Sequence, residues 1–362
     1  MCFFFTLTAR ESASSRVSEI TKTFEQMKSV VTEGGGRPFI TKWQGERGEV
    51  LEIPIVGQYQ LVIKDESGKE VINEEVTIAD EEHPYLFTPP ADGLYTVEAG
   101  PQGVEYMRMT TGCTSKTSLL EVVQFGTVRW RSMHAMFRGC ERMTFAPDID
   151  TPDLCQVTGM SEMFRGCSAF NQPLEKWDVG NVTDMHWMFF GCSAFNQPLE
   201  GWNVGQVTNM CGMFYECRSF NQPLEGWNVE NVEDMGCMFF GCSAFNQPLE
   251  AWNVENVEGM YSMFSGCSAF NQPLEAWNVE SVEDMSGMFS GCSAFNQPLE
   301  AWNVESVEDM SGMFSGCSAF NQSLGAWDIT NLPKDALLDI FTDCPAGALP
   351  FAQEWRGKGY EL

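Results

Sequence analysis

Positively charged residues are scarce in this 362-residue sequence. It contains 21 Lys and Arg residues against 50 Asp and Glu residues, which gives a formal net charge of −29 at pH 7. Binding to a nucleic-acid backbone needs Lys and Arg side chains that contact phosphates, so this balance excludes nucleic acid as an expected partner. An acidic chain of this kind suits a basic partner, a divalent cation or simply a soluble surface.

Long apolar runs are absent as well. No stretch approaches the roughly 18–20 apolar residues that cross a bilayer, so we expect no transmembrane segment. The apolar start, Met1-Cys2-Phe3-Phe4-Phe5, has no basic residue before it and is too short for a convincing secretory signal. On this evidence alone, a cytoplasmic location stays open beside a surface or extracellular one.

The residue patterns of common catalytic and metal sites are also missing. The three histidines, His83, His134 and His186, fall in different parts of the chain, which does not support a Ser-His-Asp or Cys-His pair. There is no glycine-rich phosphate loop, no H-E-x-x-H motif and no cysteine pairing of the kind that binds zinc. We therefore expect a protein that is not an enzyme, with no catalytic residues and no metal ligands.

A 25-residue repeat organises most of the sequence. Its clearest copy runs from Val282 to Val304 and reads VEDMSGMFSGCSAFNQPLEAWNV. The repeat tryptophans are Trp177, Trp202, Trp227, Trp252, Trp277, Trp302 and Trp327. The repeat cysteines are Cys167, Cys192, Cys217, Cys242, Cys267, Cys292 and Cys317. A fixed period of this length is typical of stacked structural units, and it indicates a column of buried thiols that act as small hydrophobes. Disulfides between neighbouring units stay open as an alternative in an oxidising compartment.

The spacing within one unit predicts a strand followed by a short helix. Leu299, Trp302 and Val304 have the L-x-x-L-x-L spacing of a leucine-rich-repeat strand. The apolar residues from Val307 to Cys317 then recur three or four residues apart, which favours a short α or 3₁₀ helix on the opposite side. We therefore predict a leucine-rich-repeat-like solenoid over residues 136–331, with a β-strand and a short helix in each 25-residue coil.

The repeat pattern resembles a known family. The motif V-x-x-M-x-x-M-F-x-x-C-x-x-F-N-Q-x-L-x-x-W-[ND]-V recurs between about Val128 and Cys344. It is similar to the BspA-like leucine-rich-repeat surface proteins, in particular to those with 25-residue repeats of the mycoplasma-lipoprotein type. The resemblance implies a surface-exposed or extracellular protein whose repeats recognise a partner.

The segments outside the repeats predict four further regions. Residues 37–112 alternate apolar and polar positions between Gly-, Pro- and acid-rich turns, which indicates a small all-β sandwich. This segment resembles the PKD-like module that precedes such repeats in related surface proteins. Residues 1–36 form an N-terminal arm with an expected helix over 11–33, and residues 113–135 form a connector and N-terminal cap. Residues 332–362 form a C-terminal cap with an expected helix over 333–342.

Two sets of repeat positions are candidate binding surfaces. Large side chains replace the usual small ones in the coils between about residues 160 and 265, and these form a candidate aromatic patch: His186, Trp187, Phe190, Tyr215, Phe240 and Tyr261. Drift, or packing against a neighbouring module, is the alternative for this patch. The second candidate is the strand-side face, made of Asn203, Asn228, Asn253, Asn278 and Asn303 with Glu230, Glu255, Glu280 and Glu305. Hydrogen bonding from asparagine to asparagine along the column is the structural alternative there.

Glutamates recur in columns as well. Two such columns are Glu200, Glu225, Glu250, Glu275 and Glu300, and Glu233, Glu258, Glu283 and Glu308. Like charges on neighbouring units repel. Solvent screening, raised carboxyl pKa values or bound Ca²⁺ would relieve the repulsion, and screening is our interpretation because no compact calcium loop occurs. We expect no cofactor, with bound Ca²⁺ as the alternative.

These patterns lead to one functional hypothesis and one alternative. We expect a non-enzymatic surface recognition or adhesion protein that binds a protein or glycan partner through the repeats. The alternative is a structural or self-assembling subunit, inside the cell or outside it, that uses the repeats as a packing scaffold.

Overall fold

The computed structural model describes residues 36–362 of the chain, and the expected helix over residues 11–33 lies outside them. The chain divides into two units, Met1–Arg37 and Pro38–Leu362. The strands of the second unit are β1 (Phe39–Gly45), β2 (Leu51–Ile53), β3 (Ile55–Lys64), β4 (Glu70–Ile78), β5 (Tyr85–Phe87), β6 (Gly93–Ala99), β7 (Val104–Met107), β8 (Leu119–Gln124) and β9 (Thr144–Phe145). Its helical elements are η1 (Lys116–Ser118), η2 (Pro345–Ala348) and α2 (Pro350–Gly357).

The N-terminal part of this unit is built around a single mixed sheet. Seven strands follow the order β4-β3-β6-β1-β8-β9, with β7 on β3, while β2 and β5 form a separate two-stranded sheet. The pairs β1/β6 and β3/β4 are antiparallel, whereas β9 lies parallel to β8. This arrangement corrects the prediction of a small all-β sandwich, because the large sheet continues through β8 and β9 toward the repeats.

The core of this sheet continues into the first repeats without a break. Alternate residues of β1, from Phe39 to Gly45, are buried, as expected for a strand with one face against a core. The ring of Phe39 packs edge-on against Trp130 at a centroid distance of 5.0 Å, and Phe125 packs against Trp177 at 5.5 Å. The sheet therefore covers the N-terminal end of the repeats with apolar side chains.

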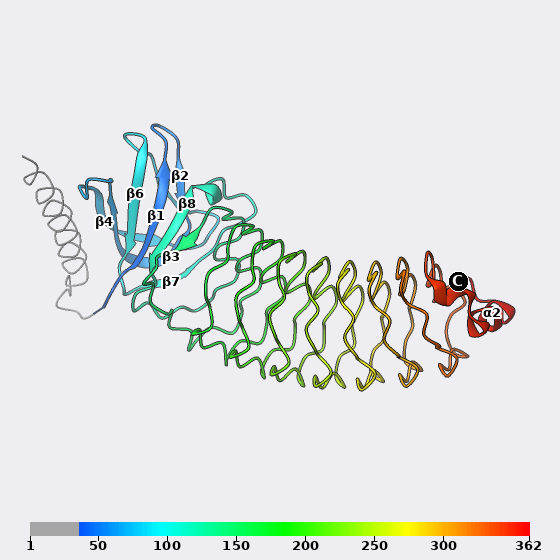
Figure 1. The fold of residues 1–362 in the computed structure, drawn as a ribbon. Coiled ribbons are helices and arrows are strands. Elements are labelled where there is room, and N and C mark those ends of the chain that lie inside the picture. Colours follow the sequence, from blue (N-terminus) through cyan, green and yellow to red (C-terminus); the bar gives the residue numbers. More distant parts are fainter. Residues whose placement is uncertain (1–35) are drawn as a thin grey trace, which may run out of the picture. The chain divides into compact units, whose positions relative to one another are not determined.

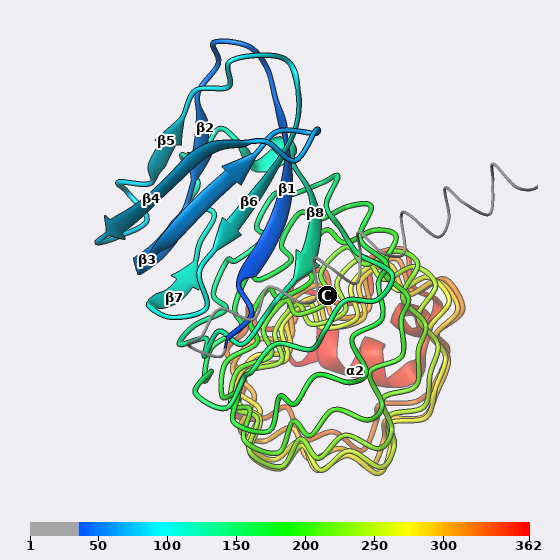
Figure 2. The ribbon, with the colours of Figure 1, turned by 90° about the vertical axis from the view of Figure 1, so that its left-hand side faces the viewer.

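The repeats wind as successive coils that overlay one another (Figures 1 and 2). Neighbouring coils are joined by isolated parallel bridges such as Asp184↔Asn209 and Asn209↔Asp234. Between β9 and η2 the coils contain neither a helix nor a strand. The predicted leucine-rich-repeat-like fold, with a β-strand and a short helix in every coil, is therefore wrong.

The backbone hydrogen bonds explain why no helix forms. In the coil from Met210 to Cys217, the N–H groups of Met210, Gly212 and Phe214 donate to carbonyls of the next coil over 2.8–2.9 Å. The intervening N–H groups of Met213, Tyr215 and Cys217 donate to carbonyls three residues back in their own coil. An α-helix needs every N–H to bond four residues back along its own segment, so this alternation excludes it. It nevertheless keeps the three-or-four-residue apolar spacing that resembled a helix.

The expected strand is absent for a related reason. Around Trp302, the backbone N–H bonds back to Leu299 within a turn of the same coil. The link to the preceding coil is made by the side chain, because the Trp302 indole Nε1 donates to the Leu274 carbonyl over 3.0 Å. Indole contacts of this kind replace the backbone ladder that a strand requires.

Two backbone positions in each coil adopt left-handed conformations. One of them is Gly312 in the late coils, with φ +61°, and the same position holds Trp187 and Ser262, with φ +54° and +52°. This conformation is unfavourable for a residue with a Cβ atom unless neighbours hold it in place. This position therefore suits glycine, although some coils fill it with other residues.

Substitution at this position has a defined expected effect. A Cβ atom added at Gly312 meets nothing within 4 Å, so Gly312→Ala adds left-handed strain without a clash. We expect it to lower the free energy of unfolding by about 1 kcal/mol. Ser262→Gly relieves the same strain and should be neutral or slightly stabilising. Urea denaturation of the two variants measures the difference, and equal stabilities would contradict the strain argument.

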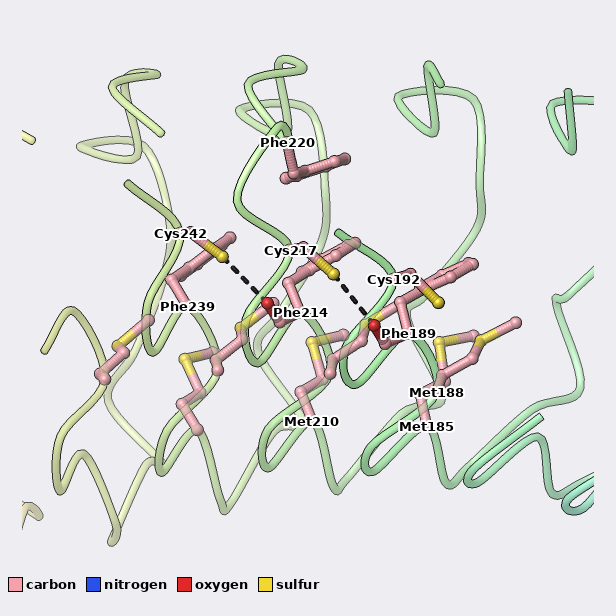
Figure 3. Close-up of a cluster of buried hydrophobic side chains, with 14 of the residues drawn as sticks. Met185, Met188, Phe189, Cys192, Met210, Phe214, Cys217, Phe220, Phe239 and Cys242 are labelled. Carbon is pink, nitrogen blue, oxygen red and sulfur yellow. Dashed lines mark hydrogen bonds between the residues drawn. The ribbon is translucent and has the colours of Figure 1, made fainter. Parts of the chain in front are cut away.

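Phenylalanine, methionine and cysteine side chains fill the interior of the coils (Figure 3). Phe214 stacks on Phe220 at a centroid distance of 4.2 Å and on Phe239 of the next coil at 5.7 Å. The Cys217 thiol donates to the Phe189 carbonyl over 3.0 Å, and Cys242 donates to Phe214 over 2.9 Å (Figure 3). The repeat cysteines are buried and free, which confirms their interpretation as small hydrophobic residues, and burial raises the pKa of the Cys217 thiol well above its ordinary value.

The C-terminal end of the coils is closed by α2. Residues 333–342 form turns, so the helix predicted there is wrong and the helix lies later, at Pro350–Gly357. Trp355 of α2 stacks on Trp327 of the last coil at a centroid distance of 6.5 Å. The hydroxyl of the buried Tyr360 donates to the Ile329 carbonyl. These contacts cover the final tryptophan of the repeat column.

Candidate functional site

Three aromatic side chains stack on the surface of consecutive coils. Phe190 and Tyr215 have ring centroids 4.4 Å apart and an interplanar angle of 7°, and Tyr215 and Phe240 are 4.4 Å apart at 4°. All three are half-buried. We call Phe190, Tyr215 and Phe240 the aromatic column. The structure thus brings half of the candidate aromatic patch into one continuous feature.

An arginine covers the N-terminal end of the aromatic column. The guanidinium carbon of Arg165 lies 4.7 Å from the Phe190 ring centroid and 4.5 Å from that of Trp187. Glu162 holds this arginine through a 3.0 Å ion pair and also pairs with Arg138 at 2.9 Å. Because Glu162 is buried, its charge needs both arginines as partners. Cation–π contact with Arg165 therefore completes one end of the stack.

His186 and Trp187 join the column from the side. Trp187 packs edge-on against Phe190 at 6.1 Å, and His186 packs against Trp187 at 5.8 Å. The imidazole Nδ1 of His186 lies 2.8 Å from the Asp184 carboxylate. A Cβ atom at Gly212 would come within 2.3 Å of the Trp187 ring, so the indole lies directly on this glycine of the next coil.

Tyr261 lies apart from this stack, over earlier coils. A Cβ atom at Gly236 would come within 2.2 Å of the Tyr261 ring, so the ring rests on that glycine. The Tyr261 hydroxyl lies 3.1 Å from the thiol of Cys211, two coils back. Burial raises the pKa of Tyr261 above its ordinary value. The glycines at 212 and 236 are thus the sequence signal for these two contacts, and sequence analysis did not use it.

The column ends abruptly after Phe240. The equivalent positions in the following coils are Ser265, Ser290 and Ser315. From residue 219 to residue 331 the sequence contains no Lys, Arg or His, while Asp and Glu recur in every coil. The last ring of the column therefore borders a region of negative charge.

The candidate asparagine face has a different geometry from the expected one. Its asparagines are exposed, and each accepts a hydrogen bond from a backbone N–H of its own coil, as Asn228 does from Glu230 at 3.2 Å. The Asn228 amide also donates to the Glu230 carboxylate over 3.0 Å. These bonds close individual turns, so the expected hydrogen bonding along this column is wrong for these asparagines.

A second asparagine column makes the bonds between coils. The side-chain oxygen of Asn196 accepts the backbone N–H of Asn221 at 2.9 Å and the amide of Gln222 at 3.0 Å. The same pair of bonds recurs along the repeats, through Asn171, Asn221, Asn246, Asn271 and Asn296. The sequence signal for these bonds is the Phe-Asn-Gln that recurs in the repeat motif.

The repeats match the model of a known protein family. The family model described as "Mycoplasma protein of unknown function, DUF285" matches residues 131–252 and 238–346, which together span more than half of the chain. The chain belongs to the DUF285 family. No curated protein and no solved structure is significantly similar to it. The DUF285 match includes the aromatic column and ends before α2.

The glutamate columns of the DUF285 region are exposed to solvent. Between residues 36 and 362, no group of three or more His, Cys, Asp or Glu side chains is arranged to hold a metal ion. Calcium binding by the acidic columns stays an untested alternative to solvent screening. In the same range, no helix is long and apolar enough to cross a membrane.

One side-chain pair of the DUF285 region resembles part of a catalytic site. The Nδ1 of His134 lies 2.6 Å from the Ser161 hydroxyl of the next coil, so stacking joins residues that are distant in sequence. Burial lowers the pKa of His134, and Ser161 is only 4% exposed. A nucleophile must reach its substrate, and this hydroxyl is covered. We therefore interpret the pair as a packing contact.

Proposed function

We propose that this DUF285 protein is a non-enzymatic recognition protein that binds a partner protein through the aromatic column and the adjoining Trp187 and Arg165. Following its resemblance to BspA-like proteins, we place this role at the cell surface. The single observation that carries the proposal is the aromatic column itself. It fills, in three consecutive coils, a position that later coils fill with serine.

The composition of the surface supports a binding role. Tyr, Trp and Arg are enriched among the residues that dominate the binding energy of protein interfaces. Here Trp187, Tyr215 and Arg165 occur together and are already held in place by stacking and by the Glu162 ion pair. A preorganised surface loses little conformational entropy on binding.

The ring orientation favours a protein over a glycan as partner. Within the column the rings lie nearly parallel at 4.4 Å, so their faces cover one another and their edges border the surface. A sugar ring stacks best on an open aromatic face, whereas neighbours in the stack cover both faces of Phe190 and of Tyr215. An apolar strip of ring edges instead suits the side chains of a protein surface.

The ends of the repeats bear on the alternative of self-assembly. Phe39 and Trp130 pack at the sheet end, and Trp355 stacks on Trp327 at the α2 end. Head-to-tail stacking of coils between copies would have to displace these caps. Recognition of a different protein is therefore our preferred proposal over a self-assembling scaffold.

The test is a binding screen with a serine variant. The triple variant Phe190→Ser, Tyr215→Ser and Phe240→Ser converts the aromatic column into the residue that later coils carry. The labelled full chain and the variant are applied to peptide and glycan arrays of defined composition. We expect the full chain to bind peptides, with at least a tenfold loss in the variant.

A matched control replaces exposed apolar residues elsewhere. Val50, Leu86 and Leu94 are 48%, 62% and 40% exposed, so their replacement by serine removes apolar surface outside the repeats. This control should keep its binding, and circular dichroism checks that both variants fold. Unchanged peptide binding by the column variant, or binding to glycans alone, would overturn the proposal.

A further inference from the structure

We propose that the face of Phe240 that points away from Tyr215 binds an arginine side chain from a basic segment of a partner polypeptide. The inference rests on the proposed function and names the chemistry of its partner. It starts from an asymmetry of the aromatic column, because an arginine covers the first ring and no ring covers the last one in the part of the chain that the structure describes.

The N-terminal end of the column shows how such a contact is made. Arg165 stands at the position that Phe190 and Tyr215 occupy in the next two coils, and its guanidinium lies 4.7 Å from the Phe190 ring centroid. The stack thus runs from a cation through three rings. At the other end the same position is Ser265, whose short side chain cannot extend across a ring. Phe240 is half-buried, and it stacks on Tyr215 of the preceding coil.

The charge around this end selects a cation. Between residues 219 and 331 the chain has no basic side chain, and the coil of Phe240 and the two coils after it carry Asp234, Glu258 and Asp284. The basic residue just before this range, Arg218, already forms an ion pair with Glu216 over 2.7 Å. Nearby carboxylates raise the local concentration of a basic ligand, and an aromatic face attracts a cation through its quadrupole. Arg165 has Glu162 as its own carboxylate, whereas a guest arginine at Phe240 would be neutralised by this acidic surface.

Arginine fits the site better than lysine. The guanidinium group is planar and weakly hydrated, so it can lie flat on a ring, whereas an ammonium group is compact and strongly hydrated. The site therefore adds selectivity to the general attraction between an acidic protein and a basic peptide. Plain charge attraction would not distinguish the two residues.

The experiment uses two labelled nonapeptides of alternating sequence, Arg-Gly and Lys-Gly, with the full chain. Fluorescence anisotropy at low and at physiological salt gives the affinities. We expect the Arg-Gly peptide to bind more tightly than the Lys-Gly peptide. Phe240→Ser should weaken Arg-Gly binding about three- to tenfold. Leu86→Ser, which removes an exposed apolar side chain outside the repeats, should change it less than twofold.

A second pair of variants tests occupancy of the face. Ser265→Arg places an arginine of the chain itself over Phe240 and should weaken peptide binding as Phe240→Ser does. Ser290→Arg adds the same charge to the same column one coil later, where the preceding residue is Ser265 and no ring is available. This control should keep most of the binding and shows the effect of charge alone.

The outcomes separate this inference from the proposed function. Equal affinity for the Arg-Gly and Lys-Gly peptides, or equal losses in Ser265→Arg and Ser290→Arg, would overturn the arginine site. The array screen with the triple serine variant could still succeed in that case, because it depends on the whole column. Self-association of the chain without peptide, seen in sedimentation and lost in Phe240→Ser, would mean that a second copy covers Phe240 and would also overturn the inference.

Discussion

Replacing Phe239 by alanine is expected to lower the free energy of unfolding by about 3–5 kcal/mol. Phe239 is completely buried, and its ring lies 4.2 Å from that of Phe245. It also stacks on the equivalent buried rings of the two neighbouring coils, Phe264 at 5.6 Å and Phe214 at 5.7 Å. The substitution leaves a cavity in the middle of a continuous stack, and rigid neighbouring coils cannot collapse to fill it. Denaturant unfolding followed by near-ultraviolet circular dichroism measures the loss.

The adjacent residue is the matched control for this prediction. Phe240 has the same side chain, but it is half-buried and stacks on a single ring, Tyr215. We expect Phe240→Ala to cost about 1 kcal/mol, in line with one aromatic pair. Similar losses for both variants would mean that Phe240 belongs to the core. This result would contradict the proposal that the aromatic column is a binding surface.

The second large effect is expected at the C-terminal end. Trp355 is 2% exposed and contacts Trp327, Phe341 and Phe351. Trp355→Ala should cost about 3–5 kcal/mol locally, because it exposes the last coil to water. In a protein built from repeats, each coil is stabilised mainly by its neighbours, so the loss should spread inward from this end.

Hydrogen exchange measured by mass spectrometry resolves this gradient. Protection should fall most in the last coil and least near the sheet. Leu338→Ala is the control, because Leu338 is 44% exposed and its truncation should change protection little. A uniform loss of protection along the chain would show that the coils unfold as one cooperative unit, against this prediction.

The sequence predicted what the repeats bury better than how their backbone runs. The columns of Trp, Met, Phe and Cys are buried throughout, as their 25-residue spacing indicated. The strand and helix were wrong because apolar spacing reports which side chains face inward and not where each N–H donates. In the coil from Met210 to Cys217, donation alternates between the next coil and the same coil, a pattern that has no signature in apolar periodicity.

The candidate site was predictable only in part. The large residues at 187, 190, 215 and 240 stood out against the serines and glycines of later coils, and the structure brings them together. The roles of their neighbours depended on three-dimensional stacking. Arg165 over Phe190, and Trp187 over Gly212, join residues about 25 positions apart, so neither contact could be inferred from one coil alone.

The asparagine that links each coil to the next would allow the repeats to be extended by whole 25-residue units. Because Asn196 bonds to Asn221 as Asn221 bonds to Asn246, one further copy of the 25-residue unit could be inserted among the later coils with every bond repeated. Each added copy would move α2 away from the sheet by about 4.8 Å, the spacing of hydrogen-bonded neighbouring chains. The aromatic column would keep its distance from the sheet, since it lies before those coils. The number of repeats would thus set the distance between α2 and the sheet without any change to the aromatic column.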